Sequence, residues 1–236
     1  MIDPAVPVSV VVSCEHGGNR IPPVYQLFFQ GHEALLASHR GYDPGALLMA
    51  KAIARQFGAP LFAAATSRLL IDLNRSVGHP QLFSEFTRNL PPVIKEKILD
   101  YYYRPYRQRV ETAVAEAIQH GRRVIHLSSH SFTPQLHGKV RKADIGLLYD
   151  PASEWELSLC RRWQRSLTQE LPGLTIRRNY PYTGTADGFT AYLRRRYASG
   201  WYAGIELEVN QKYFLDDRGK WRSLRRIIVA TLSKIF

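Results

Sequence analysis

Short apolar runs alternate along the chain with longer segments in which apolar residues recur every three or four positions. The short runs predict strands over residues 8–13, 60–65, 68–73, 122–128, 145–149, 174–177 and 201–209. Helical spacing predicts helices over residues 22–39, 43–58, 91–121, 153–171, 189–198 and 218–236. Strands thus alternate with helices, and no linker or repeat interrupts them. The pattern therefore predicts an α/β fold with a mostly parallel sheet, in a single domain over residues 1–236.

Polar residues gather where the predicted strands end. Glu15 and His16 follow the first strand, Asn74 and Arg75 follow the strand at 68–73, and His130 follows the strand at 122–128. In α/β sheets, ligands bind beyond the carboxyl ends of the strands. Two imidazoles at one edge can bind a zinc ion, and a catalytic zinc site adds a carboxylate. The alternative is that each histidine is a structural hydrogen-bonding residue, as we expect for His126 inside its strand.

Two carboxylates are candidates for the third metal ligand. Glu15 adjoins His16, and neighbours on an extended segment point in opposite directions, which argues against both binding one ion. Asp43 precedes Pro44 at a predicted helix start, so its side chain could equally be an N-cap. Both alternatives stay open at this level.

The last predicted strand carries two carboxylates on one face. Glu206 and Glu208 alternate with Ile205 and Leu207, so acidic and apolar side chains lie on opposite faces. A buried carboxylate beside a metal can act as a general base. The alternative is an edge strand with a polar face, or ion pairs with arginines.

Other polar side chains are candidates for binding an anionic substrate. Arg75 at a strand end suits forked recognition of a carboxylate or stabilisation of an oxyanion. Arg68 is equally well explained by an ion pair, and Asp72 is expected to orient a neighbour. The loop at 179–184 contains Tyr182, whose hydroxyl could donate to a carboxylate; packing within the loop is the alternative.

The net charge is +12, and residues 119–236 contribute +10 of it. Such a basic half could meet nucleic acid, an anionic membrane surface or an acidic small molecule. No apolar run approaches the length of about 20 residues that spans a membrane, and no signal-peptide pattern is present. Two cysteines argue against a disulfide framework and favour a cytoplasmic location.

Six segments occur in an order that resembles the N-formylglutamate amidohydrolase family, over roughly residues 8–214. They are Glu-His-Gly-Gly-Asn-Arg-Ile-Pro (15–22), Tyr-Asp-Pro-Gly-Ala (42–46), Ser-Arg-Leu-Leu-Ile-Asp-Leu-Asn-Arg (67–75), His-Ser-Phe-Thr-Pro (130–134), Asn-Tyr-Pro-Tyr-Thr-Gly (179–184) and Glu-Leu-Glu-Val-Asn (206–210). The resemblance implies a three-layer α/β/α sandwich with a mixed sheet, like that of zinc carboxypeptidases and aspartoacylases.

The resemblance also implies roles for particular residues. His16 and His130 are expected to be zinc ligands, and Asp43 resembles a retained acidic ligand. Glu208, which forms Glu-x-x-Gln with Gln211, is expected to be the general base, with Glu206 as the alternative. The expected substrate-binding residues are Arg68, Asn74, Arg75, Asn19, Ser131 and Tyr182, and Arg75 is also expected to act in catalysis.

The chain departs from related patterns at two positions of the expected metal site. Asn19 stands where carboxypeptidase-like sites have the glutamate of His-x-x-Glu, so the acidic ligand must come from Asp43 or Glu15, unless Asn19 itself completes the site. Ser128 stands where relatives often have an aspartate two residues before the second histidine. The carboxylate that would orient His130 is therefore missing or comes from elsewhere.

These implications predict a cytoplasmic enzyme that uses zinc, or another divalent ion, to hydrolyse an N-acyl amino acid. N-formyl-L-glutamate is the expected substrate, cleaved to formate and L-glutamate. Another acyl amino acid or a peptide is the alternative within this fold. Neither nucleic acid nor membrane is expected as a partner, and a basic nucleic-acid-binding module is the alternative from a different class.

Overall fold

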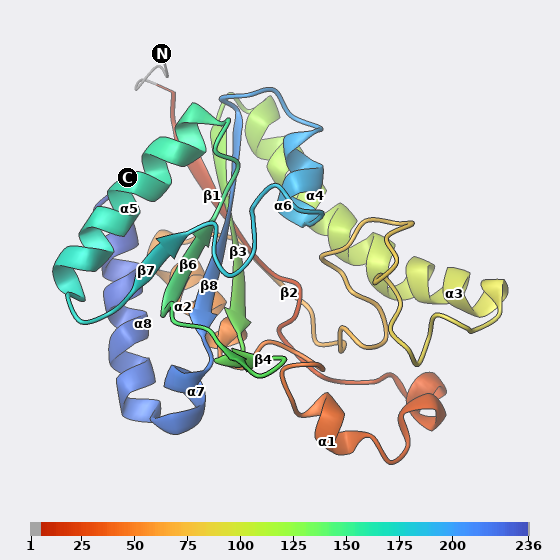
Figure 1. The fold of residues 1–236 in the computed structure, drawn as a ribbon. Helices are drawn as coiled ribbons and strands as arrows, with labels where there is room; N and C mark the ends of the chain where they lie inside the picture. The colour runs from red at the N-terminus through yellow and green to blue at the C-terminus, as the bar shows by residue number, and fades with distance from the viewer. Residues whose placement is uncertain (1–5, 236) are drawn as a thin grey trace.

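The computed structural model describes residues 6–235. Its main sheet has six strands in the order β2-β1-β3-β8-β6-β7 (Figure 1). The strands are β1 (Val8–Cys14), β2 (Leu61–Ala63), β3 (Arg123–Phe132), β6 (Ile145–Leu148), β7 (Ile176–Arg178) and β8 (Tyr202–Asn210). β6 runs antiparallel to β8, and the other pairings are parallel. The expectation of a mixed, mostly parallel sheet is confirmed.

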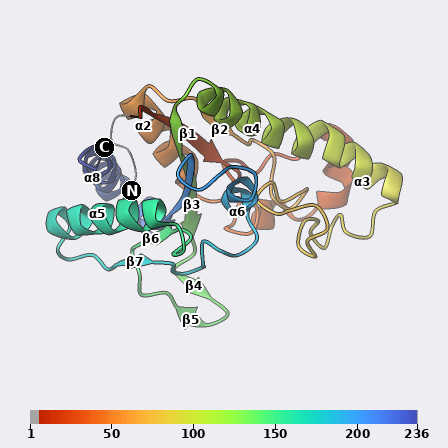
Figure 2. The ribbon, with the colours of Figure 1, turned by 90° about the horizontal axis from the view of Figure 1, so that it is seen from above.

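Helices cover both faces of this sheet (Figure 2). One face carries α2 (Ala46–Phe57), α5 (Glu154–Glu170) and α8 (Arg218–Ser233). The other carries α6 (Phe189–Arg194) and a long helical segment. That segment consists of α3 (Pro92–Ile98), the π-helical turns η2 (Leu99–Tyr103) and α4 (Arg104–Gln119). The three layers form the expected α/β/α sandwich.

The alternation of β8 gives its two faces different chemistry. Ile205, Leu207 and Val209 pack into the cluster under α2, α5 and α8. Glu206 and Glu208 lie on the opposite face, yet both are buried. β8 lies between β3 and β6 in the sheet, so the interpretation of a polar edge strand is wrong. Two carboxylates buried in the middle of a sheet call for partners or a function.

Most predicted elements match the structure to within a few residues. The helix expected to start at Ser153 does so, with the Ser153 hydroxyl accepting a hydrogen bond from the Glu156 backbone N–H. The predicted last helix ends at Ser233, and residue 236 lies outside the described residues. The helix expected over 22–39 is instead a 3₁₀ segment, η1 (Pro23–Phe29), and the short α1 (Glu33–Leu36), separated by Gly31 at a φ of 78°.

The strand predicted over 68–73 is wrong, because this segment forms turns instead. Leu69, Leu70, Ile71 and Leu73 are all buried, so both sets of alternating side chains face the interior. Local hydrogen bonds replace a strand ladder, including Leu70 N–H to the Ser67 carbonyl and Arg75 N–H to the Asp72 carbonyl.

Two further elements escaped the sequence pattern. A small hairpin joins β4 (Gln135–Leu136) to β5 (Lys139–Val140), and α7 (Lys212–Asp216) follows β8. Each is too short to give a periodic signal.

Candidate metal centre and catalytic site

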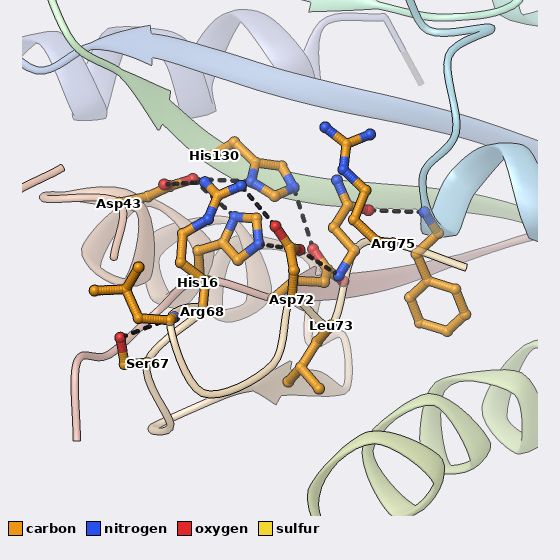
Figure 3. Close-up of polar contacts among 12 residues, drawn as sticks. His16, Asp43, Ser67, Arg68, Asp72, Leu73, Arg75 and His130 are labelled. Atoms are coloured by element: carbon orange, nitrogen blue, oxygen red, sulfur yellow. Dashed lines mark hydrogen bonds and ion pairs between the residues drawn. The ribbon is translucent and has the colours of Figure 1, made fainter. Parts of the chain in front are cut away.

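Two histidines and an aspartate meet at the carboxyl ends of β1 and β3 (Figure 3). His16 follows β1, His130 lies near the end of β3, and Asp43 comes from the loop before α2. One ligand atom from each lies within 4.8 Å of the others, and all three residues are buried. The imidazole centroids are 5.0 Å apart. The fold therefore brings together three side chains that are distant in sequence.

The hydrogen bonds leave the inner atoms of this cluster facing one another. His130 Nδ1 lies 2.9 Å from Asp43 Oδ2, and His16 Nδ1 lies 3.4 Å from the same oxygen. Within residues 6–235, His16 Nδ1 is buried without a hydrogen-bond partner. Two imidazoles and one carboxylate form a ligand set that zinc uses in catalytic sites, where one position stays open. The residues present fit such an ion.

Asp72 fixes the orientation of His16. Its Oδ1 lies 2.7 Å from His16 Nε2 and accepts the Asn74 backbone N–H, while its Oδ2 accepts from Arg68 Nη2 at 2.7 Å. Burial alone would raise the pKa of Asp72, but the charges of Arg68 and His16 lower it well below its usual range. Asp72 is therefore an anionic partner that turns His16 Nδ1 toward the cluster.

Glu15 takes the corresponding position beside His130. Its Oε2 accepts from Ser128 Oγ at 2.6 Å and lies 3.2 Å from His130 Nε2. Burial opposes ionisation of Glu15, but hydrogen bonding and the charge of His130 outweigh burial and lower the pKa. Residues 15 and 16 form a turn rather than extended chain, so their side chains do not follow the alternation expected of a strand. Glu15 lies behind the cluster and supplies the carboxylate that position 128 lacks.

Asp43 does not cap α2. The helix N-cap is Gly45, which makes no side-chain capping bond. The Asp43 carboxylate instead faces His130, His16 and the Ser131 backbone N–H. Burial would raise the pKa of Asp43, but the neighbouring histidines hold it far below its ordinary value.

Glu208 is the carboxylate of β8 that has a free oxygen at this site. It pairs in register with His130 on β3, and its Oε2 is buried with no hydrogen-bond partner in the described chain. Burial, reinforced by Asp43 and Glu206, raises the pKa of Glu208 to about 8 despite the opposing charge of His130. Such a proton-holding carboxyl group in a polar cluster is typical of functional sites.

Glu206 is already engaged elsewhere. Its Oε1 accepts a hydrogen bond from Thr190 Oγ1 at 2.6 Å. A Cβ at Gly188 would lie 3.1 Å from that oxygen and 3.4 Å from Asn74 Oδ1, so only glycine fits there without displacement. Glu206 thus lies against the chain entering α6.

The loop at 179–184 passes close to Gly146 on β6. A Cβ at Gly146, the register partner of Glu208 on β6, would lie 2.0 Å from the Tyr180 carbonyl oxygen. Glycine at 146 therefore lets this loop approach the sheet beside the site. Tyr182, at its tip, has 46% of its surface exposed, and its hydroxyl accepts from Arg141 Nη2 at 3.0 Å.

Arg75 and Asn74 reach the site from the turn region rather than from a strand. Arg75 Nη1 donates to the Asp187 carbonyl at 2.5 Å, and no carboxylate of residues 6–235 forms an ion pair with it. The Arg75 carbonyl is held by Tyr103 Oη and Arg107. Asn74 Oδ1 accepts the Phe189 backbone N–H.

The remaining predicted substrate contacts have partners within the protein. Arg68 binds Asp72 and lies 3.5 Å from Asp43. Ser131 Oγ donates to the Pro44 carbonyl and accepts from Gln211, so it supports the loop of Asp43. Asn19 donates to the Leu36 carbonyl and contributes no atom to the three-residue cluster.

Arg141 is a further candidate for substrate binding that the sequence pattern did not predict. It follows the β4–β5 hairpin, and its guanidinium lies 5.0 Å from the Tyr182 ring and 5.8 Å from that of Phe132, two residues beyond His130. Its Nη1 is buried without a partner among the described residues. The only signal was the general excess of basic residues, which does not distinguish one arginine from another.

A three-layer α/β/α sandwich with a His-Asp-His cluster and a buried glutamate at its carboxyl edge places the chain among α/β proteins with a candidate metal centre. The family model described as N-formylglutamate amidohydrolase matches residues 8–215. The chain therefore belongs to the N-formylglutamate amidohydrolase family.

Solved structures share the fold of this chain. Gene product Atu2144 from Agrobacterium tumefaciens is 28% identical, with a TM-score of 0.82 over 96% of this chain and 90% of that one. N-formylglutamate amidohydrolase from Ralstonia eutropha JMP134 shares the fold at 19% identity, with a TM-score of 0.72 over 98% of this chain and 94% of its own. No curated protein sequence matches the chain. Within residues 6–235, no helix is long and apolar enough to cross a membrane.

Proposed function

We propose that this chain is a metal-dependent amidohydrolase that cleaves the acyl amide of a small anionic N-acyl amino acid. N-formyl-L-glutamate is the substrate we expect, with formate and L-glutamate as products. The observation that carries the proposal is the convergence of His16, Asp43 and His130 within 4.8 Å, with a His16 Nδ1 that accepts or donates no hydrogen bond within residues 6–235. The family match supports the reaction class.

We assign the three residues of this cluster as metal ligands. A bound zinc ion would polarise the acyl carbonyl and lower the pKa of an attacking water. Asp72 and Glu15 would hold the two imidazoles in the tautomers that present Nδ1 to the ion. A different divalent ion could bind to the same ligands in place of zinc, but the two nitrogen donors favour zinc.

Glu208 is the general base in this proposal. Its free Oε2 accepts a proton from the attacking water and returns it to the leaving amine nitrogen. Positive charge at the neighbouring cluster lowers the pKa of a carboxyl group, so Glu208 would be ionised at neutral pH when a cation is bound. Glu206, already bonded to Thr190, is the weaker candidate.

Two guanidinium groups, which form no ion pair with a carboxylate among the described residues, would bind the anionic parts of the substrate. Arg75 suits the amino-acid carboxylate or the oxyanion, and Asn74 lies beside it. Arg141, with its buried unpartnered Nη1, suits a second carboxylate, together with Tyr182. Arg68 is committed to Asp72 and Asp43, so we assign it to positioning the cluster rather than to holding substrate.

Formate release from N-formyl-L-glutamate tests the reaction directly. Purified protein is assayed as prepared, after removal of metal with EDTA, and after zinc is restored, alongside N-acetyl and N-succinyl amino acids. We expect activity to disappear with the chelator and return with zinc. Full turnover by metal-free protein would refute the metal-dependent mechanism, and preference for another acyl group would reassign the substrate.

A cytoplasmic location remains part of the proposal. Cys14 and Cys160 are both buried, and neither forms a disulfide, which is compatible with a reducing compartment.

A further inference from the structure

A groove lined by arginines lies between α2 and α8, away from the metal cluster. It encloses about 670 Å³, and the guanidinium-bearing residues along it are Arg55 from α2 and Arg222, Arg225 and Arg226 from α8. α2 is 12 residues long, which corresponds to about 18 Å. Asp43 precedes the first turn of this helix and Arg55 lies in its last turn, so the groove is remote from the candidate catalytic site.

These four arginines have no counter-charge in the described part of the chain. The ion pairs of the α8 region involve other cations: Lys220 pairs with Asp217 and Lys234 with Glu170. Burial lowers the pKa of Arg225, and the charges of Arg222 and Arg55 lower it further. The guanidinium groups are therefore close enough to repel one another.

The spacing on α8 concentrates this charge on one side of the helix. Arg225 and Arg226 follow Arg222 by three and four positions, so each is a neighbour of Arg222 on the helix surface. The opposite side carries Trp221, Leu224 and Ile228, which are buried in the core. Like charges at this spacing destabilise a helix, and Arg55 adds a further cation across the groove. A basic helix face that only contacts solvent would not need a further arginine on the facing wall of the groove.

We propose that this groove binds a small anion that carries two or more phosphate groups. Arginine presents a planar fork of N–H donors that matches phosphate oxygens bidentately. Four forks on two facing walls suit a chain of phosphates better than a single anion. The volume lies in the range of small-molecule sites, and Ala52, Val229 and Ala230 line the groove between the charged residues. The proposed amidohydrolase site does not use any of these residues.

The test measures binding of tripolyphosphate and of ATP by calorimetry at 0.15 M salt, with inorganic phosphate as the comparison that carries a single phosphate group. At this ionic strength, exposed charges more than about 8 Å apart are largely screened. The groove variant is Arg222→Gln with Arg226→Gln. The matched control is Arg161→Gln with Arg162→Gln, which removes the same charge from exposed positions of α5 in the same layer.

We expect saturable binding at one site per chain, weakened about tenfold or more in the groove variant and unchanged in the control. Tighter binding of ATP than of tripolyphosphate would identify a nucleotide as the source of the phosphates, whereas equal binding would identify the phosphate chain alone. Equal weakening in both variants, or no saturable binding, would overturn the proposal. The proposal would also be overturned if the protein preferred a single-stranded oligonucleotide and both variants weakened that binding equally. The basic residues of α5 and α8 would then form a nucleic-acid-binding surface.

Discussion

Replacing Glu15 with glutamine tests whether a carboxylate outside the ligand set controls metal binding. Glu15 is fully buried, and one of its oxygens faces both Ser128 Oγ and His130 Nε2. The substitution keeps the size of the side chain but removes the negative charge behind His130. The imidazole then loses the partner that favours a proton on Nε2 and a free Nδ1.

The expected magnitude follows from the contact that is lost. Loss of an outer partner of a metal-bound histidine weakens metal affinity by about 10- to 100-fold, which is about 1.4–2.8 kcal/mol of binding free energy. The other oxygen of Glu15 accepts from Tyr106 Oη at 3.1 Å, a bond that glutamine can retain through its carbonyl. We therefore expect the fold to survive and the loss to appear in the zinc dissociation constant.

Competition with a chromophoric zinc chelator measures this constant for wild type, Glu15→Gln and a control. Glu116→Gln on the exposed side of α4 is the control, because it removes one negative charge far from His130. Thermal unfolding of the metal-free proteins checks that each variant is folded. An unchanged zinc affinity in folded Glu15→Gln would refute the assignment of Glu15 as the residue that positions His130.

Three further predictions concern the general base, the second substrate carboxylate and the buried imidazole of His126. Glu208→Gln should lower kcat by about 10²- to 10⁴-fold while zinc stays bound. Glu206→Gln should lower kcat much less. If a formate-release assay gives the reverse order, Glu206 is the general base instead of Glu208. Arg141→Gln should raise the KM for N-formylglutamate more than the KM for N-formylglutamine, and Lys142→Gln is the exposed control. Equal effects on the two KM values would show that Arg141 does not contact the second carboxylate. His126 is hydrogen-bonded to Tyr202 and Ser13, and burial lowers its pKa to about 4. As the pH falls below about 6.5, this histidine is therefore protonated in the unfolded chain before it is protonated in the folded one. The folded state then loses stability as the pH falls from about 6.5 to about 4. Urea unfolding should show that wild type loses about 2 kcal/mol more than His126→Gln between pH 7.5 and pH 5, and parallel curves would contradict the buried neutral imidazole.

The sequence pattern predicts the layers of this fold well, because periodicity reports which side of an element is buried. The opposed faces of β8 and the caps of α5 and α2, at Ser153 and Gly58, are examples. The segment at 68–73 shows the limit of this reasoning. Its apolar residues are all buried without a regular period, and its path follows short-range hydrogen bonds that the side chains of Ser67 and Asp72 accept from backbone N–H groups.

The sequence predicts which residues form the candidate site, but it does not predict which of them are hydrogen-bonded to one another. The order of the motifs indicated His16 and His130. Only the folded structure shows that Glu15 pairs with His130 and that Asp72 pairs with His16. The pairing depends on a turn after β1 and on the folded loop before Asn74, and neither carries a periodic signal. Arg141 depends in the same way on a hairpin of two-residue strands.

The residues of the His-Asp-His cluster are widely separated along the chain; Asp43 and His130 alone are 87 positions apart. A metal ion bound there would recognise only a fully assembled molecule, since no fragment or half-formed intermediate presents all three donors. At a free ion concentration a thousand times the dissociation constant, such selective binding adds about 4 kcal/mol to native stability. The supply of the ion in the cell would then govern how long the protein survives as well as how fast it turns over substrate.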